Sequence, residues 1–349
     1  MIGAASGTIA AINGQTPSGC NSIVQRHKTT SISLINRKLQ NVQDATSLST
    51  VITIVLILAL EMVVDPNRDP DAANIHLAGL RNIIGLRGGY DGLPMSLVQW
   101  IIFQDFSYAV IHRTFPRFPI IPRKSPLSGA KYRAISKRVN LELGSLSSEI
   151  LSSRYVPLLD PTQVDAYTEL SIVIAFRESC IGDQSELELV ETDYFDTIWL
   201  RAQHSLISFS SSNMFRQDSD VQNICRIVVP MFVVQTQLIT YRHSPAAESL
   251  KDQFLEVIAS LDLQKLWEHF HELMVWAFMF VCHSCREQAW RERFLLEVAK
   301  GGQGRMKWEW QEVRKLLLGF FFVDRLHGKD FRKMCEEVRL LDSPVKAEM

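Results

Sequence analysis

What the sequence lacks narrows the class of protein before any motif is considered. Its 37 basic and 38 acidic side chains leave a formal net charge of −1 over 349 residues. No broad positive field is therefore present to hold a phosphate backbone, so the composition gives no support to nucleic-acid binding. Cysteine is also scarce, with 6 residues, and no Asn-x-Ser/Thr acceptor for glycosylation occurs. Both features favour a reducing, intracellular compartment.

Long apolar runs are equally scarce. The most hydrophobic segment is Leu48–Val64, and its apolar part Val51–Leu60 is far shorter than the ~20 residues that cross a bilayer. We read it as a buried core helix and expect a soluble protein without membrane contact; a membrane-associated protein that uses Val51–Leu60 is the weaker alternative. Residues 1–46 lack the basic start and leucine-rich run of a signal peptide. They are expected to form a poorly ordered or partly helical lead-in.

What is present is helical periodicity along almost the whole chain. Apolar residues from Ala73 to Ile84 follow a 4-3-4 spacing, which lines one face of a helix. No convincing alternating strand occurs; the valine-rich segment Arg226–Gln235 has Pro230 at its centre, so a kinked or broken helix is expected there. The predicted fold is all-α, a large irregular helical bundle with no substantial sheet. Further helical stretches are expected at 48–64, 95–113, 161–180, 188–216, 220–241, 245–261, 263–298, 307–322 and 329–341, with room for one break in each of the long ones.

Composition also marks two connections in the first half of the chain. Residues 65–71, DPNRDPD, separate two helices and offer Asp71 as a helix N-cap. Residues 115–129 hold four prolines and must be extended rather than helical. We expect this run to be a connector packed over the bundle through Phe118, Ile120 and Ile121; a polyproline ligand for a partner domain is the alternative.

The expected organisation follows from these connections. One helical domain covers 47–341, and a short tail covers 342–349. Two lobes that meet near 115–160 are the alternative within the same domain.

The best metal-binding candidate is CHSC, which runs from Cys282 to Cys285. A CxxC pair supplies two zinc ligands, whereas a structural zinc site needs four, and no second pair completes it. His269 and His271 lie two residues apart, which places them on different faces of one helix. Buried cysteines in an apolar helix are therefore the favoured interpretation, and we predict no metal and no cofactor.

Motifs that define common enzyme classes are absent. The glycine-rich segments GGYDG and GGQGRM match neither nucleotide-binding glycine pattern, and no GxSxG elbow or HExxH motif occurs. We therefore predict no catalytic residues and no enzyme activity, with an unrecognised helical enzyme as an alternative. A second alternative is a small-molecule-binding helical protein with a pocket lined by Trp276, Phe280 and Phe320.

One segment, HLAGLRNIIGLRGGYDGLP at 76–94, is more specific. Its helix should end at Gly88 and Gly89, because glycine adopts the left-handed conformation that closes a helix without a Cβ clash. The next helix carries Asp105 on an otherwise apolar face, and a buried carboxylate needs a partner. We predict a structural joint made of Arg87, Gly88, Gly89 and Asp105. In it, Asp105 accepts hydrogen bonds from the Arg87 side chain or from the N–H groups of the two glycines.

The same segment carries a family resemblance. HLAGLRNIIGLRGGYDGLP, then LVQWIIFQDFSYAV with Asp105, then PRFP, resembles the fungal-specific transcription factor domain. The late segment WEWQEVRKLLLGFFFVDRLHGKDFRKMCEEV at 308–338 is similar to the end of that domain. The resemblance covers roughly residues 47–341, and it is strongest at the two ends of that range.

The resemblance implies an all-α regulatory region that acts in the nucleus through protein or small-molecule contacts rather than catalysis. Such regions usually follow a zinc binuclear-cluster DNA-binding module with six clustered cysteines. The first 60 residues hold only Cys20, so that module is not found in this sequence. We expect no direct nucleic-acid binding by this chain. Protein partners or self-association through an apolar helix face are expected, with a small-molecule inducer as a further expectation.

Overall fold

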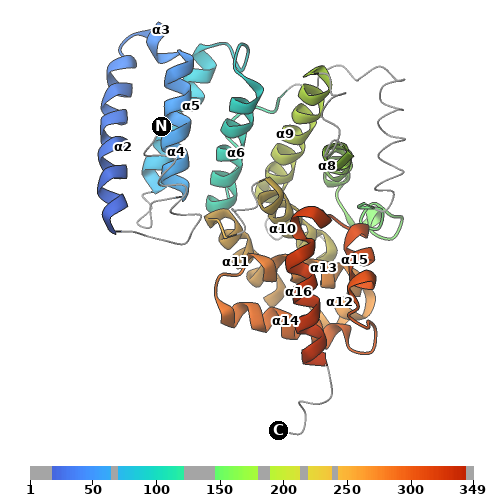
Figure 1. Cartoon of the computed structure of the whole chain (residues 1–349). Helices are drawn as coiled ribbons and strands as arrows, with labels where there is room; N and C mark the ends of the chain where they lie inside the picture. Colours follow the sequence, from blue (N-terminus) through green and yellow to red (C-terminus); the bar gives the residue numbers. More distant parts are fainter. Residues whose placement is uncertain are drawn as a thin grey trace. The chain divides into compact units, whose positions relative to one another are not determined.

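The all-α prediction is confirmed. A computed structural model describes residues 18–63, 70–121, 146–179, 189–212, 219–237 and 243–342, and across these ranges it contains α-helices, one 3₁₀ turn and no strand (Figure 1). Helical periodicity was sufficient for this result because it is a local property of each segment.

The chain divides into two compact units, Met1–Ile120 and Ile121–Met349. Unit 1 contains α2 (Ser18–Lys38), α3 (Val42–Ala45), α4 (Leu48–Val63), α5 (Pro70–Leu86) and α6 (Met95–His112). The domain start expected at residue 47 stays a prediction; α2, which lies in the expected lead-in, is helical and packs on α4 within unit 1. Residues 1–17 and 343–349, which include most of the predicted tail, lie outside the described residues.

Two helices form the core of unit 1. In α6, every residue from Ile101 to Val110 is buried, which agrees with its apolar sequence on all sides. In α4, Val51 and Leu58 are buried, whereas Ile52 is 36% exposed, so this helix has one open side. Helix α5 begins at Pro70, so the prediction that Asp71 caps it is wrong. Proline suits a first helical position because its missing N–H has no partner there in any case.

Unit 2 contains one 3₁₀ turn and the remaining helices of the described chain. They are η1 (Val156–Leu158), α8 (Pro161–Ser179), α9 (Leu189–Ser212), α10 (Asp220–Gln237), α11 (Pro245–Ala259), α12 (Leu263–His269), α13 (His271–Ser284), α14 (Gln288–Gly302), α15 (Trp310–Gly319) and α16 (Asp324–Asp342). Side chains start two of them: the Ser244 hydroxyl accepts from Ala247 N at 3.2 Å, and the Asp262 carboxylate accepts from Lys265 N at 3.1 Å.

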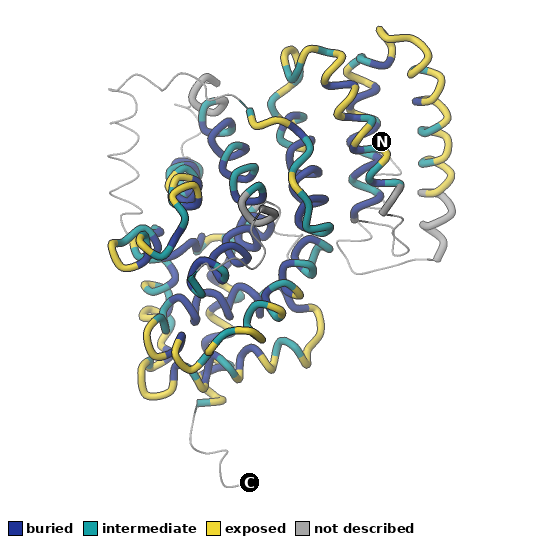
Figure 2. Tube along the Cα trace, turned by 180° about the vertical axis from the view of Figure 1, so that it is seen from behind, coloured by how far each residue is buried: buried dark blue, intermediate teal, exposed yellow. Residues whose placement is uncertain are grey.

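Helix α13 is the centre of unit 2. Every residue from Leu273 to Cys282 is buried, and α10, α11, α12, α14, α15 and α16 pack around it. In Figure 2 such inward-facing stretches are dark blue, whereas α2 of unit 1 is yellow along much of its length. An apolar helix this short and buried on all sides is a core element.

The helical stretch expected at 263–298, for which one break was allowed, is three helices with two breaks, at Phe270 and at 285–287. His269 therefore ends α12 and His271 begins α13, so they do not share one helix as predicted. Helix α10 runs through Pro230, in agreement with the helical interpretation, and it is one continuous element rather than a broken one.

None of the helices in the described ranges is long and apolar enough to span a membrane.

Two glycines near the end of α14 make room for indole rings. A Cβ atom on Gly301 would overlap the ring of Trp267, and one on Gly302 would overlap the ring of Trp308. Both rings are buried, at 8% and 2% exposure, so neither can swing into solvent without opening the core. The glycine-rich segment at 299–306 is thus a close-packing site as well as a connector.

Replacing Gly302 with Ala should lower the free energy of unfolding by about 1–3 kcal/mol, because the added methyl group forces the Trp308 ring out of place. Gly79→Ala is the matched control, since a Cβ on this helical glycine meets nothing within 4 Å. It should be neutral or stabilising by up to about 1 kcal/mol. Urea unfolding measures both, and equal effects of the two substitutions would contradict the packing argument.

Candidate functional site: the Asp105 junction

The end of α5 forms the glycine cap that the sequence predicts. Gly88 and Gly89 have φ angles of +81° and +116°. Gly88 N donates to Gly85 O at 3.0 Å, and Gly89 N donates to Ile84 O at 2.9 Å. This pair of bonds is the Schellman arrangement, which satisfies two carbonyl groups that the helix end would otherwise leave open. The turn that follows leads through Gly92, with φ +75°, into α6.

Asp105 lies on α6 and is 2% exposed, so the predicted burial is confirmed. Its carboxylate accepts three contacts from backbone N–H groups: Arg117 N lies 3.0 Å from Oδ1 and 2.8 Å from Oδ2, and Phe118 N lies 2.9 Å from Oδ2. Phe118 itself is buried, at 1% exposure. The carboxylate therefore holds the chain that leaves α6 against the side of α6.

The local sequence explains why these two N–H groups are available. In PRFP, Pro116 and Pro119 carry no N–H, and they keep the segment extended, so Arg117 and Phe118 have no helical acceptor for theirs. Arg113, with φ +53°, turns the chain out of α6 just before this segment. A buried N–H without an acceptor is costly, and Asp105 supplies the acceptor for both residues at once.

The Arg117 side chain extends the junction to α5. Its guanidinium lies 4.7 Å from the centre of the Tyr108 ring, and its Nη1 donates to Asn74 O at 3.4 Å. Helices α5 and α6 and the PRFP segment therefore all contribute to this one place.

The predicted partners of Asp105 are wrong. Arg87 donates through Nη1 to Thr46 O, at the end of α3, rather than to Asp105. Gly88 and Gly89 use their N–H groups within the helix cap. The predicted joint is therefore two separate contacts, a glycine cap with Arg87 tied to α3, and Asp105 tied to Arg117 and Phe118. Of the residues flanking the junction, sequence reasoning also placed Ile120 in the interior, but it is 40% exposed.

Burial and the neighbouring groups shift the pKa of the Asp105 carboxyl in opposite directions. Burial raises the pKa of the Asp105 carboxyl to about 6, while the N–H groups of Phe118 and Arg117 and the guanidinium groups of Arg117 and Arg81 lower it. Tyr90, from the turn between α5 and α6, has a buried hydroxyl without a hydrogen-bond partner in the described chain. Burial and the nearby Asp105 charge both raise the pKa of Tyr90, so this phenol stays protonated.

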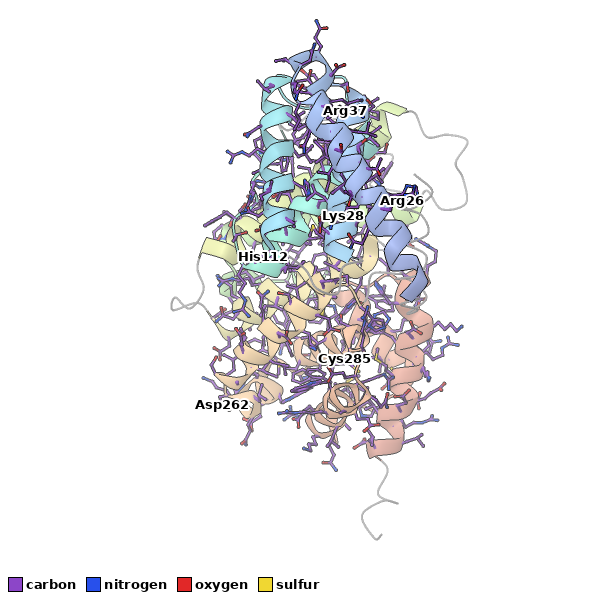
Figure 3. The ribbon with its side chains drawn as sticks, turned by 90° about the vertical axis from the view of Figure 1, so that its left-hand side faces the viewer. Arg26, Lys28, Arg37, His112, Asp262 and Cys285 are labelled. Carbon is purple, nitrogen blue, oxygen red and sulfur yellow. The ribbon has the colours of Figure 1, made fainter. Side chains whose placement is uncertain are left out.

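A second buried acid of unit 1, Glu61 on α4, was not singled out from the sequence. It is 2% exposed, and its Oε1 lies 2.9 Å from Lys28 Nζ and 3.7 Å from His76 Nε2. Lys28 lies on α2 between Arg26 and Arg37 (Figure 3). Burial lowers the pKa of His76, and Glu61 opposes that effect. The signal for this pair was weak because Glu61 follows the apolar run of α4 like an ordinary solvent-facing residue.

The CHSC segment at the end of α13 keeps its cysteines as thiols. Cys282 and Cys285 are buried, and burial raises the pKa of each to about 12. Their Sγ atoms point to the carbonyl oxygens of Arg291 and Val281, at 3.6 and 3.3 Å. In the described part of the chain no three His, Cys, Asp or Glu side chains gather as metal ligands would.

The two residues between the cysteines make the polar contacts instead. His283 Nδ1 lies 2.7 Å from Gln235 Oε1, and His283 Nε2 lies 3.2 Å from Asp330 Oδ2. Gln235 Nε2 donates to Ser284 Oγ at 2.6 Å and to Phe280 O at 3.1 Å. This chain of contacts ties α10, α13 and α16 together, and it was missed because its members are far apart in sequence.

The rings predicted to line a pocket are in contact with one another. The ring centres of Trp276 and Phe320 lie 5.3 Å apart, and those of Trp276 and Phe280 lie 5.8 Å apart. Trp276 Nε1 donates to Phe321 O at 2.9 Å, and all three predicted rings are fully buried. These rings therefore pack against each other at this point of the core.

Comparisons of the chain with protein-family models, with curated proteins and with solved structures give no match. The resemblance to the fungal-specific transcription factor domain therefore rests on the quoted segments alone.

Chemically, the Asp105 junction is built to hold backbone. Both carboxylate oxygens are occupied by N–H donors, and 2% exposure leaves no approach for a substrate. It fixes the orientation of PRFP relative to α5 and α6, which together form the last part of unit 1.

Asp105→Ala should lower the free energy of unfolding by about 2–4 kcal/mol, because it leaves the Arg117 and Phe118 N–H groups buried without an acceptor. Asp91→Ala is the control; Asp91 is an exposed residue of the neighbouring turn, and its loss should change stability by no more than about 0.5 kcal/mol. Denaturant unfolding followed by far-UV circular dichroism gives both values. If Asp105→Ala unfolds at the same denaturant concentration as the wild type, the junction does not stabilise the fold.

The raised pKa of Asp105 predicts a pH dependence whose sign can be stated. Its ordinary value is 3.8 and its folded value is about 6, so between these values the folded chain binds more protons than the unfolded chain. Stability from this group is therefore lost as the pH rises through that window. Asp105→Asn has no proton to release.

We expect the free energy of unfolding of the wild-type chain, minus that of Asp105→Asn, to fall by roughly 2–3 kcal/mol between about pH 4 and about pH 7. Equilibrium unfolding at a series of pH values measures this difference. A difference that grows with pH would mean that the N–H donors outweigh burial and hold the carboxyl ionised.

Proposed function

We propose that the chain is the regulatory and interaction region of a fungal transcription factor, and that it works without catalysis of its own. The observation that supports this most is the Asp105 junction. The segments 76–94, 97–110 and 116–119, by which the sequence resembles the fungal-specific transcription factor domain, follow one another along the chain. Asp105 joins the second to the third through contacts of 3.0, 2.8 and 2.9 Å with Arg117 N and Phe118 N. The Arg117 side chain reaches α5 at Asn74 O, 3.4 Å from its Nη1. A shared set of packing residues is the kind of signature that a scaffold domain carries.

The buried titratable groups of the chain support a scaffold rather than an active site. The Asp105 oxygens are fully used by backbone donors, the Cys282 thiol is protonated, and burial lowers the pKa of His327 to about 3, which keeps this ring neutral. Asp105 lies in unit 1, whereas Cys282 and His327 lie in unit 2. Catalysis by general acid and base needs such groups to converge on one substrate.

The outer face of α5 supports contact with a protein partner or a second copy of the chain. Ile75 and Leu86 are 67% and 65% exposed, which is unusual for large apolar side chains. They lie eleven residues apart, which is three helical turns, so they share one side of the helix. Exposed apolar side chains on a common face are a feature of interaction surfaces.

The proposal is tested by tethering. The whole chain is fused to an unrelated DNA-binding domain and directed to a reporter promoter in a filamentous fungus, where a several-fold change in transcription is expected. Ile75→Glu with Leu86→Glu should abolish that change and leave the thermal midpoint as in the wild type. Ser96→Glu, at an exposed position in the first turn of α6, adds a charge elsewhere on unit 1 and should have no effect.

Two outcomes would count against the proposal. A fusion that is folded and present in the nucleus, yet leaves the reporter unchanged, would contradict the regulatory role. A normal response from the Ile75→Glu, Leu86→Glu variant would place the partner contact somewhere other than α5.

A further inference from the structure

Among the buried polar atoms of unit 2 that have no hydrogen-bond partner in the described chain, three come from one short stretch: Tyr155 Oη, Tyr167 Oη and Gln163 Oε1. The three side chains are buried, at 0%, 0% and 2% exposure. Buried polar side-chain atoms almost always find a partner in native proteins, so three exceptions in one stretch of 13 residues (155–167) need an explanation.

These residues come from neighbouring elements. Tyr155 directly precedes η1, and Gln163 and Tyr167 lie one turn apart on the inner face of α8. Both tyrosine hydroxyls also lie near the buried Cys225 thiol of α10, which contributes to the raised pKa of each. Charged groups are close as well: the Arg226 guanidinium lowers the pKa of Tyr167, and the Arg154 guanidinium, 5.3 Å from the Tyr155 ring, lowers that of Tyr155. The thiol has a raised pKa of its own from burial, so it is a neutral neighbour.

The walls around the hydroxyls are aromatic. Tyr155 lies 5.8 Å from Phe270 and 5.7 Å from Phe320, measured between ring centres, and Tyr167 lies 5.7 Å from Phe321. A few polar atoms set in an apolar, aromatic surround are the usual composition of a small-molecule site.

Stability alone does not account for these side chains. Phenylalanine has the same ring as tyrosine without the hydroxyl, and it would remove the cost of an unpaired polar atom at either position. Residues that carry such a cost are typical of functional sites, where binding satisfies the groups that folding leaves open.

We propose that Tyr155, Gln163 and Tyr167, beside Cys225, form a binding site for a small neutral molecule with an apolar body and a hydroxyl group. A hydroxyl both donates and accepts, so it can give its proton to Gln163 Oε1 and accept from a tyrosine, whereas an anionic group offers Gln163 no donor. The aromatic walls take the apolar body. The site stands on its own polar atoms and is independent of the proposed regulatory role, to which it would add a small-molecule input.

Phenol is the probe, because it is the smallest molecule with both features, and benzene is the matched compound without the hydroxyl. Phenol at ten times its dissociation constant should raise the thermal midpoint of the whole chain by roughly 3 °C, with a smaller rise for benzene. The Tyr155→Phe, Tyr167→Phe variant should lose the phenol response. Tyr194→Phe, on α9 of the same unit, should keep it.

A second measurement uses the chain without phenol. Tyr167→Phe should leave the thermal midpoint unchanged or raise it, because the deleted hydroxyl makes no hydrogen bond in the protein. A fall in the midpoint would show that the hydroxyl has a partner, and it would overturn the proposal. The proposal is overturned as well if phenol produces no rise in the thermal midpoint of the wild-type chain, since ordered water then satisfies the three atoms. It is also overturned if the double variant responds to phenol as the wild type does. None of these results bears on the reporter test.

Discussion

The burial of one carboxylate sets the arrangement of the end of unit 1. Asp105 lies in the middle of a helix whose other residues from Ile101 to Val110 are buried as well, so its charge must be met by the protein itself. The N–H groups of Arg117 and Phe118 donate hydrogen bonds to this carboxylate. They are available because the prolines on both sides keep this segment out of a helix. The carboxylate and the proline-flanked pair thus depend on each other.

The buried polar groups of unit 2 fall into two classes, those with hydrogen-bond partners and those without. Around α13, side chains serve one another: Gln235 places its amide between Ser284 and His283, and His283 passes the contact on to Asp330 at the surface. Near α8, the hydroxyls of Tyr155 and Tyr167 are left open. The first arrangement fixes the relative position of three helices, because each partner comes from a different one. The second leaves hydrogen-bonding capacity in the interior.

The sequence was a good guide wherever the cause was local. The helical fold, the glycine cap at Gly88 and the burial of Asp105 follow from spacing and residue type within a few turns of chain. The partners of Asp105 were assigned wrongly, because a carboxylate carries no sign of which N–H groups will reach it. The predicted candidates, Arg87 and the two glycines, are engaged with Thr46 and with the helix itself.

Long-range polar contacts were out of reach for a related reason. Gln235 and His283 are 48 residues apart, and nothing in either segment marks the pair. The same holds for the ion pair between Lys28 and Glu61, which joins two helices of unit 1. Helix breaks were difficult as well: Phe270, between α12 and α13, has neither proline nor glycine beside it to show that the helix stops there.

The division into two units separates the aromatic chromophores of the chain. Of the 7 tryptophans, Trp100 alone belongs to unit 1, and its side chain is 41% exposed. The others lie in unit 2, and Trp199, Trp267, Trp276 and Trp308 are buried there. Six of the seven indoles therefore report on unit 2, most of them from an apolar environment, whereas unit 1, with the Asp105 junction, contributes the single half-exposed indole of Trp100.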